Sequence, residues 1–320
     1  MAEILFIKTS SLGDVIHHMP ALTEARARRP DGRFAWVVEE AYAPLVRLHP
    51  AADRVIPVAS RRWRVALHRL ETWREIRDFR GSLRASRYDE VIDTQGLIRT
   101  GLIARWARGR KHGYDSGSIK EPIASWFYDV RHRVDRVQHA IARNRQLTAL
   151  ALGYTSSGAI DYGLDRARLA PATSAPYGVL LHATARAEKE WPLEHWRALA
   201  AELGRGIDLV VPFGNDAERV RSEAIASGVT RARVPQRQPL DAIAKLIAGA
   251  SFVVGVDTGL LHLAAALDVP VIGIFVGSEA SLTGPMGKGP ITVLGGKTTP
   301  LTVAEIMRRW SGTKVPAIWD

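Results

Sequence analysis

The sequence predicts an α/β protein built from two doubly wound domains. In both halves of the chain, short apolar runs rich in β-branched residues alternate with helical stretches, which is the rhythm of a parallel sheet with helices on both faces. At 320 residues the chain is too long for one ordinary core. The rhythm is interrupted once, at residues 154–176, where serine, glycine and proline predict an irregular connection.

The first half, residues 1–153, is expected to form one domain. Its last helical stretch, at about residues 135–152, ends at Gly153, a residue typical of helix C-termini. The expected strands lie near residues 3–8, 33–38, 53–58 and 88–93, and the other expected helices near residues 14–28, 40–48, 63–80 and 97–107.

The second half, residues 177–320, is expected to form the other domain. Two such units joined by an extended segment predict a central cleft, the usual place for an enzyme to bring two substrates together. The expected strands lie near residues 177–182, 207–212, 252–256, 270–275 and 291–294, and the expected helices near residues 193–204, 216–227, 239–249, 259–267 and 302–310. We expect the last helix to pack back on the N-terminal domain.

The composition narrows the class of protein. The net charge of +11 and the pI near 10.2 point to an anionic partner such as nucleic acid, phospholipid or a phosphorylated substrate, although an arginine-rich codon bias would give the same total. The absence of cysteine excludes disulfides and cysteine nucleophiles and fits a reducing compartment. No run approaches the roughly 18 apolar residues of a membrane span. We therefore expect a cytoplasmic protein.

Local charge density is more informative than the total. Between Arg61 and Arg87, nine arginines face only three acidic residues. Part of this segment is expected to be a solvated helix face. At its start, Arg61, Arg62 and Arg64 are candidates for an anion-binding site.

The first strand leads into a polar turn and then an amphipathic helix. This turn carries a lone carboxylate, Asp14, at the carboxyl end of the strand, where α/β proteins place ligands. Small residues here, Ser10 and Gly13 among them, let a substrate approach the backbone, and Asp14 can accept a proton from a hydroxyl. The alternative is that the turn only caps the helix.

Three polar loops follow strands of the second half. In the first loop, Thr184, Arg186 and Lys189 suit phosphate oxygens. The second contains Asn215 and Asp216, either of which could cap the next helix, and Glu218, which could bond a ribose. Because such loops converge on one sheet edge, a diphosphate or nucleotide site is predicted there.

The third loop reads as a buried strand, a turn and a helix whose N-terminal N–H groups form an anion site. Its candidate residues are Asp257, Thr258, Gly259 and His262. The alternatives are that Asp257 is only a helix cap and that His262 is only a core histidine.

Several familiar motifs are absent. The sequence has no G-x-G-x-x-G after the first strand, no P-loop, no G-x-S-x-G and no Asp-x-Asp pair for a divalent metal. His17 and His18 are adjacent on a helix and therefore point about 100° apart, which suits two environments better than one metal ion. We predict neither a metal requirement nor a cofactor.

At these residues the sequence resembles the bacterial lipopolysaccharide heptosyltransferases, the ADP-heptose:lipopolysaccharide heptosyltransferase family, and most closely the branch that adds the first heptose to the inner core. The resemblance covers almost the whole chain. It rests on ordered matches to KTSSLGDVIHHMPALTEA, WVVEEAY, RVIPVASRRWR, YDEVIDTQGLIRTGLIAR, KHGYD, KEPIASWFY and VVGVDTGLLHLAAALDVP.

The resemblance implies a GT-B fold, in which two Rossmann-like domains face a cleft. It implies that the N-terminal domain holds Kdo-lipid A and the C-terminal domain holds ADP-L-glycero-β-D-manno-heptose. By position in the matching motifs, Asp14 would be the catalytic base and Lys189 would act on the leaving diphosphate. The basic positions that could meet the acceptor's carboxylates and phosphates are Arg61, Arg62, Arg64, Arg99, Lys120 and Arg143.

The residues that match the family's sugar-nucleotide site come from both halves: Ser10, Gly13, Thr184, Lys189, Glu218, Asp257, Thr258, Gly259 and His262. One departure concerns residues 276–281. The family usually shows a Gly-Pro-Thr-Asp-Pro-like loop there, whereas this chain reads VGSEAS.

The predicted function is inverting transfer of heptose to the Kdo of Kdo-lipid A by a monomer that binds no nucleic acid. The enzyme would act peripherally on the cytoplasmic face of the inner membrane. One rival is a related heptosyltransferase that acts on a heptosylated core. The other is a non-catalytic nucleotide-binding or RNA-binding module, which would also explain the basic charge.

Overall fold

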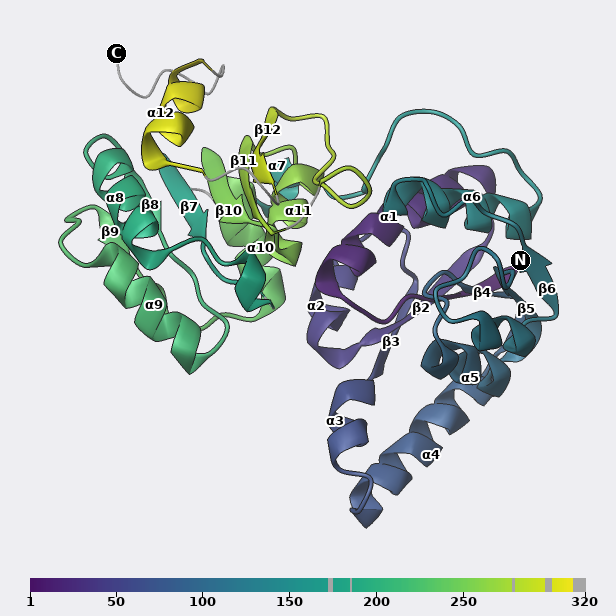
Figure 1. Cartoon of the computed structure of the whole chain (residues 1–320). Coiled ribbons are helices and arrows are strands. Elements are labelled where there is room, and N and C mark those ends of the chain that lie inside the picture. The colour runs from purple at the N-terminus through teal and green to yellow at the C-terminus, as the bar shows by residue number, and fades with distance from the viewer. Residues whose placement is uncertain (172–174, 185, 278–279, 297–300, 313–320) are drawn as a thin grey trace. The chain divides into compact units, whose positions relative to one another are not determined.

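Two compact α/β units make up the computed structural model, Met1–Gly163 and Leu164–Asp320 (Figure 1). The structure describes residues 1–171, 175–184, 186–277, 280–296 and 301–312. The division between the units lies within the segment 154–176, for which the sequence predicts an irregular connection. In the described part of that segment there is one short helix, α7 (Arg166–Leu169).

The first unit is a six-stranded parallel sheet with the strand order β3-β2-β1-β4-β5-β6. Its strands are β1 (Glu3–Ile7), β2 (Arg33–Glu39), β3 (Arg54–Val58), β4 (Arg87–Asp93), β5 (Arg108–Tyr114) and β6 (Val130–His132). Its helices are α1 (Leu12–Arg28), α2 (Ala43–Val46), α3 (Ser60–Val65), α4 (Leu70–Ala85), α5 (Ile98–Trp106) and α6 (Ala140–Leu152), with 3₁₀ turns η1 (Glu40–Tyr42) and η2 (Pro122–Phe127).

The second unit repeats this topology, with the order β12-β11-β10-β7-β8-β9. Its strands are β7 (Tyr177–Leu181), β8 (Asp208–Val210), β9 (Ala232–Arg233), β10 (Phe252–Val256), β11 (Val271–Val276) and β12 (Ile291–Gly296). Its other helices are η3 (Ala187–Lys189), α8 (Leu193–Leu203), α9 (Asp216–Ala226), α10 (Leu240–Gly249), α11 (Gly259–Ala266) and α12 (Val303–Gly312).

Both strand orders are those of a Rossmann-like, doubly wound sheet. The predicted α/β class with two such domains is therefore confirmed. In each unit the order reverses between the two central strands, β1 and β4 in the first and β7 and β10 in the second. The loops that leave the carboxyl ends of these strands diverge to opposite faces, and the crevice between them is the expected ligand site.

Several predicted elements differ from the structure. The helix predicted at residues 63–80 is two helices, α3 and α4, separated at residues 66–69. The helix predicted at residues 40–48 is the shorter pair η1 and α2, and α6 begins at Ala140 and not near residue 135. Strands β5, β6 and β9 were not predicted. Helix α6 does end where expected, because Gly153 takes the left-handed conformation at φ 73°.

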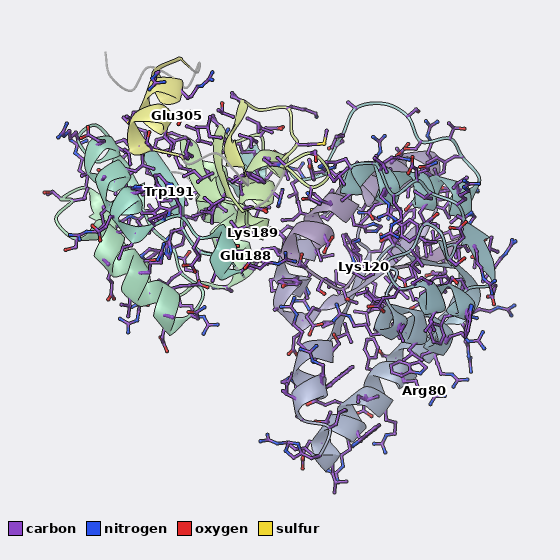
Figure 2. All side chains as sticks on the ribbon, in the orientation of Figure 1. Arg80, Lys120, Glu188, Lys189, Trp191 and Glu305 are labelled. Carbon is purple, nitrogen blue, oxygen red and sulfur yellow. The ribbon has the colours of Figure 1, made fainter. Side chains whose placement is uncertain are left out.

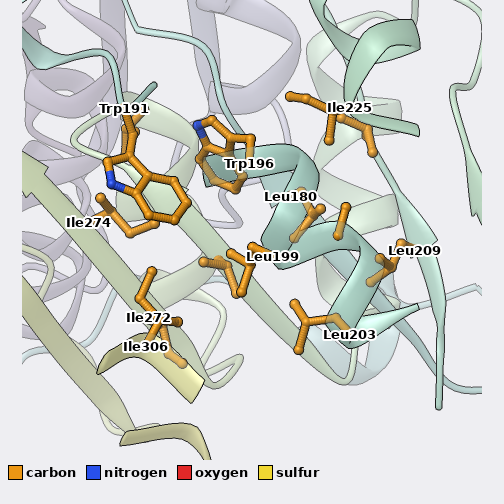
Figure 3. Close-up of a cluster of buried hydrophobic side chains, with 14 of the residues drawn as sticks. Leu180, Trp191, Trp196, Leu199, Leu203, Leu209, Ile225, Ile272, Ile274 and Ile306 are labelled. Carbon is orange, nitrogen blue, oxygen red and sulfur yellow. The ribbon is translucent and has the colours of Figure 1, made fainter. Parts of the chain in front are cut away.

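The core of the second unit is built around two tryptophans (Figure 3). The rings of Trp191 and Trp196 meet edge to face, with centroids 5.3 Å apart. The Trp191 indole N–H donates to the carbonyl of Leu301 at 3.2 Å. Helix α12, for which the sequence suggested packing on the N-terminal domain, buries Ile306 in this same cluster. Trp191 therefore ties the chain that follows Lys189 to a rigid core.

Candidate active site

At the switch point of the first sheet, residues 8–11 lie beside residues 94–96. Strands β1 and β4 pair in parallel, with Ile7 opposite Asp93, so the two loops leave the sheet together. The backbone N–H groups of Thr9 and Ser10 both donate to the side-chain oxygen of Gln95, at 3.2 Å each. This cross-loop contact fixes the backbone at the position where the sequence predicted a ligand.

Asp14 lies in the first turn of α1 and is half-buried. One carboxylate oxygen accepts hydrogen bonds from the Ser11 N–H at 2.8 Å and the Ser11 hydroxyl at 3.0 Å. The capping alternative is therefore realised in this structure. The contacts occupy one oxygen, and the second oxygen makes no hydrogen bond with a described residue. Gly13 adds no side chain beside the carboxylate.

Lys8, which sequence reasoning missed, lies in this crevice. It is buried, and its ammonium group donates to the Thr94 carbonyl at 3.0 Å and contacts the Asn144 side-chain oxygen at 3.5 Å. Burial lowers the pKa of Lys8, while the nearby carboxylates of Asp14 and Asp93 oppose that shift. The sequence signal was a lysine placed directly after the apolar run at residues 4–7.

Asp93 organises the loop after β4. Its carboxylate accepts from the N–H groups of Gln95 at 2.8 Å and Gly96 at 3.2 Å and from the Tyr128 hydroxyl at 2.7 Å. The side chain is completely buried, and burial raises its pKa. Because the Gln95 N–H donates to this buried carboxylate, Asp93 holds the backbone of Gln95 in place.

Three of the predicted basic residues differ in how firmly they are held. Each follows a different strand of the first unit. Arg99 donates to the Ser10 hydroxyl at 2.7 Å. Arg143 lies over the ring of Tyr114 at 4.8 Å and donates to the Ser118 carbonyl at 2.6 Å. Lys120 is exposed (Figure 2). The structure thus brings Arg99 against Ser10 directly and gives Lys120 no described partner.

The arginines after β3 are differently engaged. Arg61 lies over the Tyr42 ring at 5.4 Å and makes no ion pair with a described residue. Arg62 is paired with Glu40 at 3.2 Å and with Glu75 at 2.8 Å, and these hydrogen bonds raise its pKa. Arg64 is exposed. Sequence reasoning grouped the three together, but Arg62 already has carboxylate partners.

Buried Glu39 sets the position of this segment. Its carboxylate accepts from the Ser60 hydroxyl at 2.7 Å and from the Arg61 N–H at 3.0 Å. It therefore takes the place of a helix cap for α3, whose own N-cap residue has no side-chain oxygen. These two hydrogen bonds therefore hold the start of α3, and with it the backbone of Arg61, against the end of β2.

At the switch point of the second sheet, the loops after β7 and β10 are joined by polar contacts. Leu181 pairs with Gly255, so the two strands end side by side. The Thr184 hydroxyl donates to the Asp257 carbonyl at 3.0 Å. The Asp257 carboxylate forms an ion pair with Lys189, whose side chain Figure 2 labels on η3.

The Lys189–Asp257 pair is largely removed from solvent, with side chains 19% and 10% exposed. His262, one turn into α11, places Nε2 3.8 Å from the other Asp257 oxygen. The structure therefore brings four predicted residues together, Thr184, Lys189, Asp257 and His262. This cluster offers a cation, a hydroxyl and an imidazole on a rigid base.

The N-terminus of α11 adds backbone donors to the cluster. Thr258 is the N-cap residue, in extended conformation, and its side chain makes no cap hydrogen bond. Gly259 is the first helical residue and carries no side chain to shield the first turn. The N-terminal N–H groups of a helix favour an anion there. Asp257 is thus not the helix cap that one reading of the sequence allowed.

Glu218 is engaged at the start of α9. Its carboxylate accepts from the Gly214 N–H at 2.7 Å and from the Asn215 amide at 2.7 Å. Asn215 in turn accepts from the Glu218 N–H at 2.9 Å, so Asn215, and not Asp216, is the cap of α9. These reciprocal hydrogen bonds fix the Glu218 side chain and leave acceptor capacity on both of its carboxylate oxygens.

The loop after β11 approaches η3. Gly277 has φ 67°, and a Cβ there would lie 2.5 Å from the Glu188 carbonyl oxygen, so glycine is required for this close approach. Ser278 and Glu279, at the centre of the departure from the family pattern, lie outside the described residues. The described part places this loop next to the residue before Lys189.

The two adjacent histidines of α1 have separate surroundings, as predicted. The His17 ring meets His139 at 5.3 Å, whereas His18 contacts the Thr94 hydroxyl at 3.2 Å and packs against Trp36. Among the described residues, no group of three or more histidines, aspartates and glutamates could hold a metal ion. Metal independence stays a prediction.

Comparison with known proteins identifies the family. The profile of glycosyltransferase family 9 (heptosyltransferase) matches residues 76–304. The chain belongs to this family. It is 44% identical to lipopolysaccharide heptosyltransferase 1 of Escherichia coli K12 over 291 residues, which cover 89% of this chain and 91% of that protein.

Two solved structures of the E. coli heptosyltransferase WaaC agree with this assignment. The structure with ADP has a TM-score of 0.91 at 40% identity and covers 97% of this chain and 99% of that one. The structure with ADP-2-deoxy-2-fluoro heptose has a TM-score of 0.89 with the same identity and coverage. The protein is therefore a glycosyltransferase with the predicted GT-B class of fold. Among the helices that the structure describes, none has the length and apolar character needed to span a membrane.

Proposed function

We propose that this protein transfers L-glycero-D-manno-heptose from ADP-L-glycero-β-D-manno-heptose to the Kdo sugar of Kdo-lipid A, with inversion at the anomeric carbon. The observation that carries the proposal is the cluster of Thr184, Lys189, Asp257 and His262 at a Rossmann switch point in a family 9 chain. In support, a relative of the same family was solved with an ADP-heptose analogue.

The second unit is proposed to hold the donor. Lys189 and the N–H groups after Asp257 neutralise the diphosphate, which gains charge as the bond to the sugar breaks. Thr184, Thr258, Gly259 and His262 complete the site, and Glu218 accepts from the ribose hydroxyls. Asp257 keeps the Lys189 ammonium in position before the donor binds.

The first unit is proposed to hold the acceptor. The acceptor oxygen bonds to the anomeric carbon while the bond from that carbon to the phosphate oxygen breaks, and ADP leaves. Asp14 accepts the hydroxyl proton. Because a carboxylate is a weak base, this proton transfer is late and concerted with bond breaking. Ser10 and Gly13 lie beside Asp14 and are proposed to contact the transferred sugar.

Six basic side chains are proposed to meet the carboxylates and phosphates of the acceptor: Arg61, Arg62, Arg64, Arg99, Lys120 and Arg143. Three of them share helix α3, and the other three lie in α5, in the connection between β5 and η2, and in α6. Arginine suits such groups because its planar guanidinium forms paired hydrogen bonds. Because Arg62 is already paired with Glu40 and Glu75, it must exchange partners on binding.

ADP release distinguishes this activity from its rivals. With ADP-heptose present, Kdo-lipid A should stimulate release strongly and a heptosylated core should not. Stimulation by the heptosylated core alone would assign the protein to a later step, and no stimulation by either would favour a binding module. EDTA should leave turnover unchanged. Inhibition by EDTA that Mg²⁺ reverses would contradict the metal-independent mechanism.

We further propose that the enzyme works as a monomer on the cytoplasmic face of the inner membrane without binding nucleic acid. The lipid nature of the acceptor and the positive net charge of +11 support this placement. Fractionation of cells should recover the protein with inner membranes at low salt and release it at high salt. Recovery only in the soluble fraction at both salt concentrations would contradict the placement.

A further inference from the structure

A helical hairpin extends from the first unit. Helices α3 and α4 run out from the sheet and back, and their connection, residues 66–69, lies at the far end (Figure 1). This distal end exposes four large apolar side chains. They are Val65 (72% exposed), Leu67 (48%), Leu70 (72%) and Trp73 (56%). We name these four residues the hairpin tip.

Exposure of this kind calls for an explanation. Single exposed apolar residues are ordinary on protein surfaces, but four large ones within nine positions of the chain are not. They do not result from a loosely held segment, because the base of the hairpin is firmly packed. Trp63 is buried there, with its ring 5.6 Å from that of Phe79.

Glu75 ties the two helices together. It accepts from the Trp63 indole N–H at 2.7 Å and from the Arg62 guanidinium at 2.9 Å. Nearer the end, the Trp73 indole N–H donates to the Leu67 carbonyl at 2.8 Å, which fixes the ring against the turn while leaving it exposed. The tip is thus presented on a preorganised support.

The segment that contains the hairpin tip carries an excess of positive charge. Between residues 61 and 74 there are five arginines and one glutamate. Arg64, Arg69 and Arg74 are all exposed, and none forms an ion pair within the described part of the chain. Farther along α4, Arg80 is also exposed (Figure 2). An apolar tip that includes tryptophan and has exposed arginines close to it in the sequence suits an anionic lipid surface. On such a surface the apolar side chains enter the acyl boundary, and the guanidinium groups stay at the headgroups.

We propose that the hairpin tip is a membrane anchor, which inserts Val65, Leu67, Leu70 and Trp73 into the interface of an anionic phospholipid bilayer. Arg64, Arg69 and Arg74 then contact lipid phosphates. This assignment concerns a surface outside the donor and acceptor residues of the reaction, apart from Arg64. It rests on the membrane placement proposed above, but it needs neither substrate, so its failure is distinguishable from failure of the proposed transfer.

Sedimentation with lipid vesicles tests the anchor. The full-length protein should bind vesicles of phosphatidylcholine with about one third phosphatidylglycerol, without donor or acceptor, and should bind pure phosphatidylcholine much more weakly. Val65→Ser with Leu70→Ser should lower the partition coefficient at least about tenfold, because two apolar side chains no longer enter the interface. The matched control is Leu150→Ser with Val220→Ser, which removes two exposed apolar residues elsewhere.

A charge variant tests the arginines separately. Arg69→Gln with Arg74→Gln should reduce binding to the anionic vesicles by about 25-fold, since each basic residue near such a surface contributes a factor of about five. Arg205→Gln with Arg237→Gln makes the same change in net charge at exposed sites of the second unit and should have a much smaller effect. Binding of the parent protein should also fall with salt.

Three results would overturn the proposal. They are no binding to anionic vesicles, binding that the tip variants leave unchanged, and concentration-dependent self-association that Val65→Ser with Leu70→Ser abolishes. The last result would assign the tip to a contact between copies of the chain.

The far-ultraviolet circular dichroism and thermal midpoint of each variant should match those of the parent protein, because the substituted side chains are exposed. Turnover with a detergent-dispersed acceptor should be retained, so that failure of anchoring is distinguishable from failure of catalysis.

Discussion

Lys189 and Asp257 form an ion pair that joins the loop after β7 to the loop after β10. The pair lies where the strand order of the second sheet reverses, and Trp191, two residues after Lys189, is fixed in the core. Because both charged groups are largely removed from water, each depends on the other for compensation. The pair therefore both stabilises the loop after β7 and fixes the position of the Lys189 ammonium group.

The Lys189–Asp257 pair predicts that the loss of stability and the loss of activity can be separated. Lys189→Met should reduce kcat/KM at least about tenfold, because the diphosphate loses a charge-assisted contact. It should also destabilise the fold by about 1–3 kcal/mol, because the Asp257 carboxylate is left without its cation. Adding Asp257→Asn should restore part of the unfolding free energy without restoring turnover. Recovery of turnover in the double variant would exclude a direct role for Lys189.

The Asp14 carboxylate has two roles to separate. Asp14→Ala should lower kcat by about 10²–10⁴ while leaving donor affinity nearly unchanged. It should also cost about 1 kcal/mol of stability, because the carboxylate caps α1 through Ser11. Ser11→Ala is the matched control, since it removes one contact of the carboxylate and leaves the carboxylate itself. If the two variants lost activity equally, Asp14 would act as a cap and not as the base.

Much of the fold followed from the sequence, and the misses have physical causes. Alternating apolar strands and amphipathic helices gave the two sheets, because burial on both faces leaves a clear pattern. Strand β5 was missed because its first half carries Arg108, Arg110 and Lys111, and only residues 112–114 are buried. The break between α3 and α4 was missed because the helical periodicity continues across residues 66–69 with no proline or glycine.

The candidate site was predictable where it depends on strand ends. Polar residues after a buried strand point to the sheet edge where such folds bind ligands. Thr184 and Asp257 do lie in loops after strands, and Asp14 lies in the first turn of the helix that follows β1. Side-chain pairing was not predictable, because it joins residues far apart in sequence. Neither the partners of Arg62 nor the partners of Lys8 could be predicted from composition or spacing.

The buried histidines predict a loss of stability in acid. Burial lowers the pKa of His182 to about 4, with Arg221 adding to the shift, and burial likewise lowers the pKa of His49 to about 4. The ordinary value is near 6.5, so between pH 6.5 and 4 the unfolded chain binds more protons than the folded chain, and stability falls as pH falls through this window. Each histidine contributes about 3 kcal/mol at most.

Urea unfolding at several pH values between 7 and 4 measures this loss. His182→Asn should flatten the dependence of the unfolding midpoint on pH, although the variant loses the hydrogen bond to Ser222. The control is His68→Asn, which removes an imidazole from an exposed position. An unchanged slope in His182→Asn would mean that His182 is not a source of the acid sensitivity.

The arginines after β3 predict an unequal effect on the acceptor. Arg61→Ala with Arg62→Ala should raise the KM for Kdo-lipid A much more than the KM for ADP-heptose, because guanidinium groups suit carboxylates and phosphates. Of the single variants, Arg61→Ala should have the larger effect, because Arg62 is already paired with Glu40 and Glu75. The acceptor KM of the parent protein should rise with salt, and that of the double variant should rise less.

Arg80→Ala, at an exposed position on α4, is the control for loss of one positive charge. Equal acceptor KM values in the parent protein and the double variant, at low and at physiological salt, would show that this basic segment only keeps the surface solvated and that the acceptor binds elsewhere.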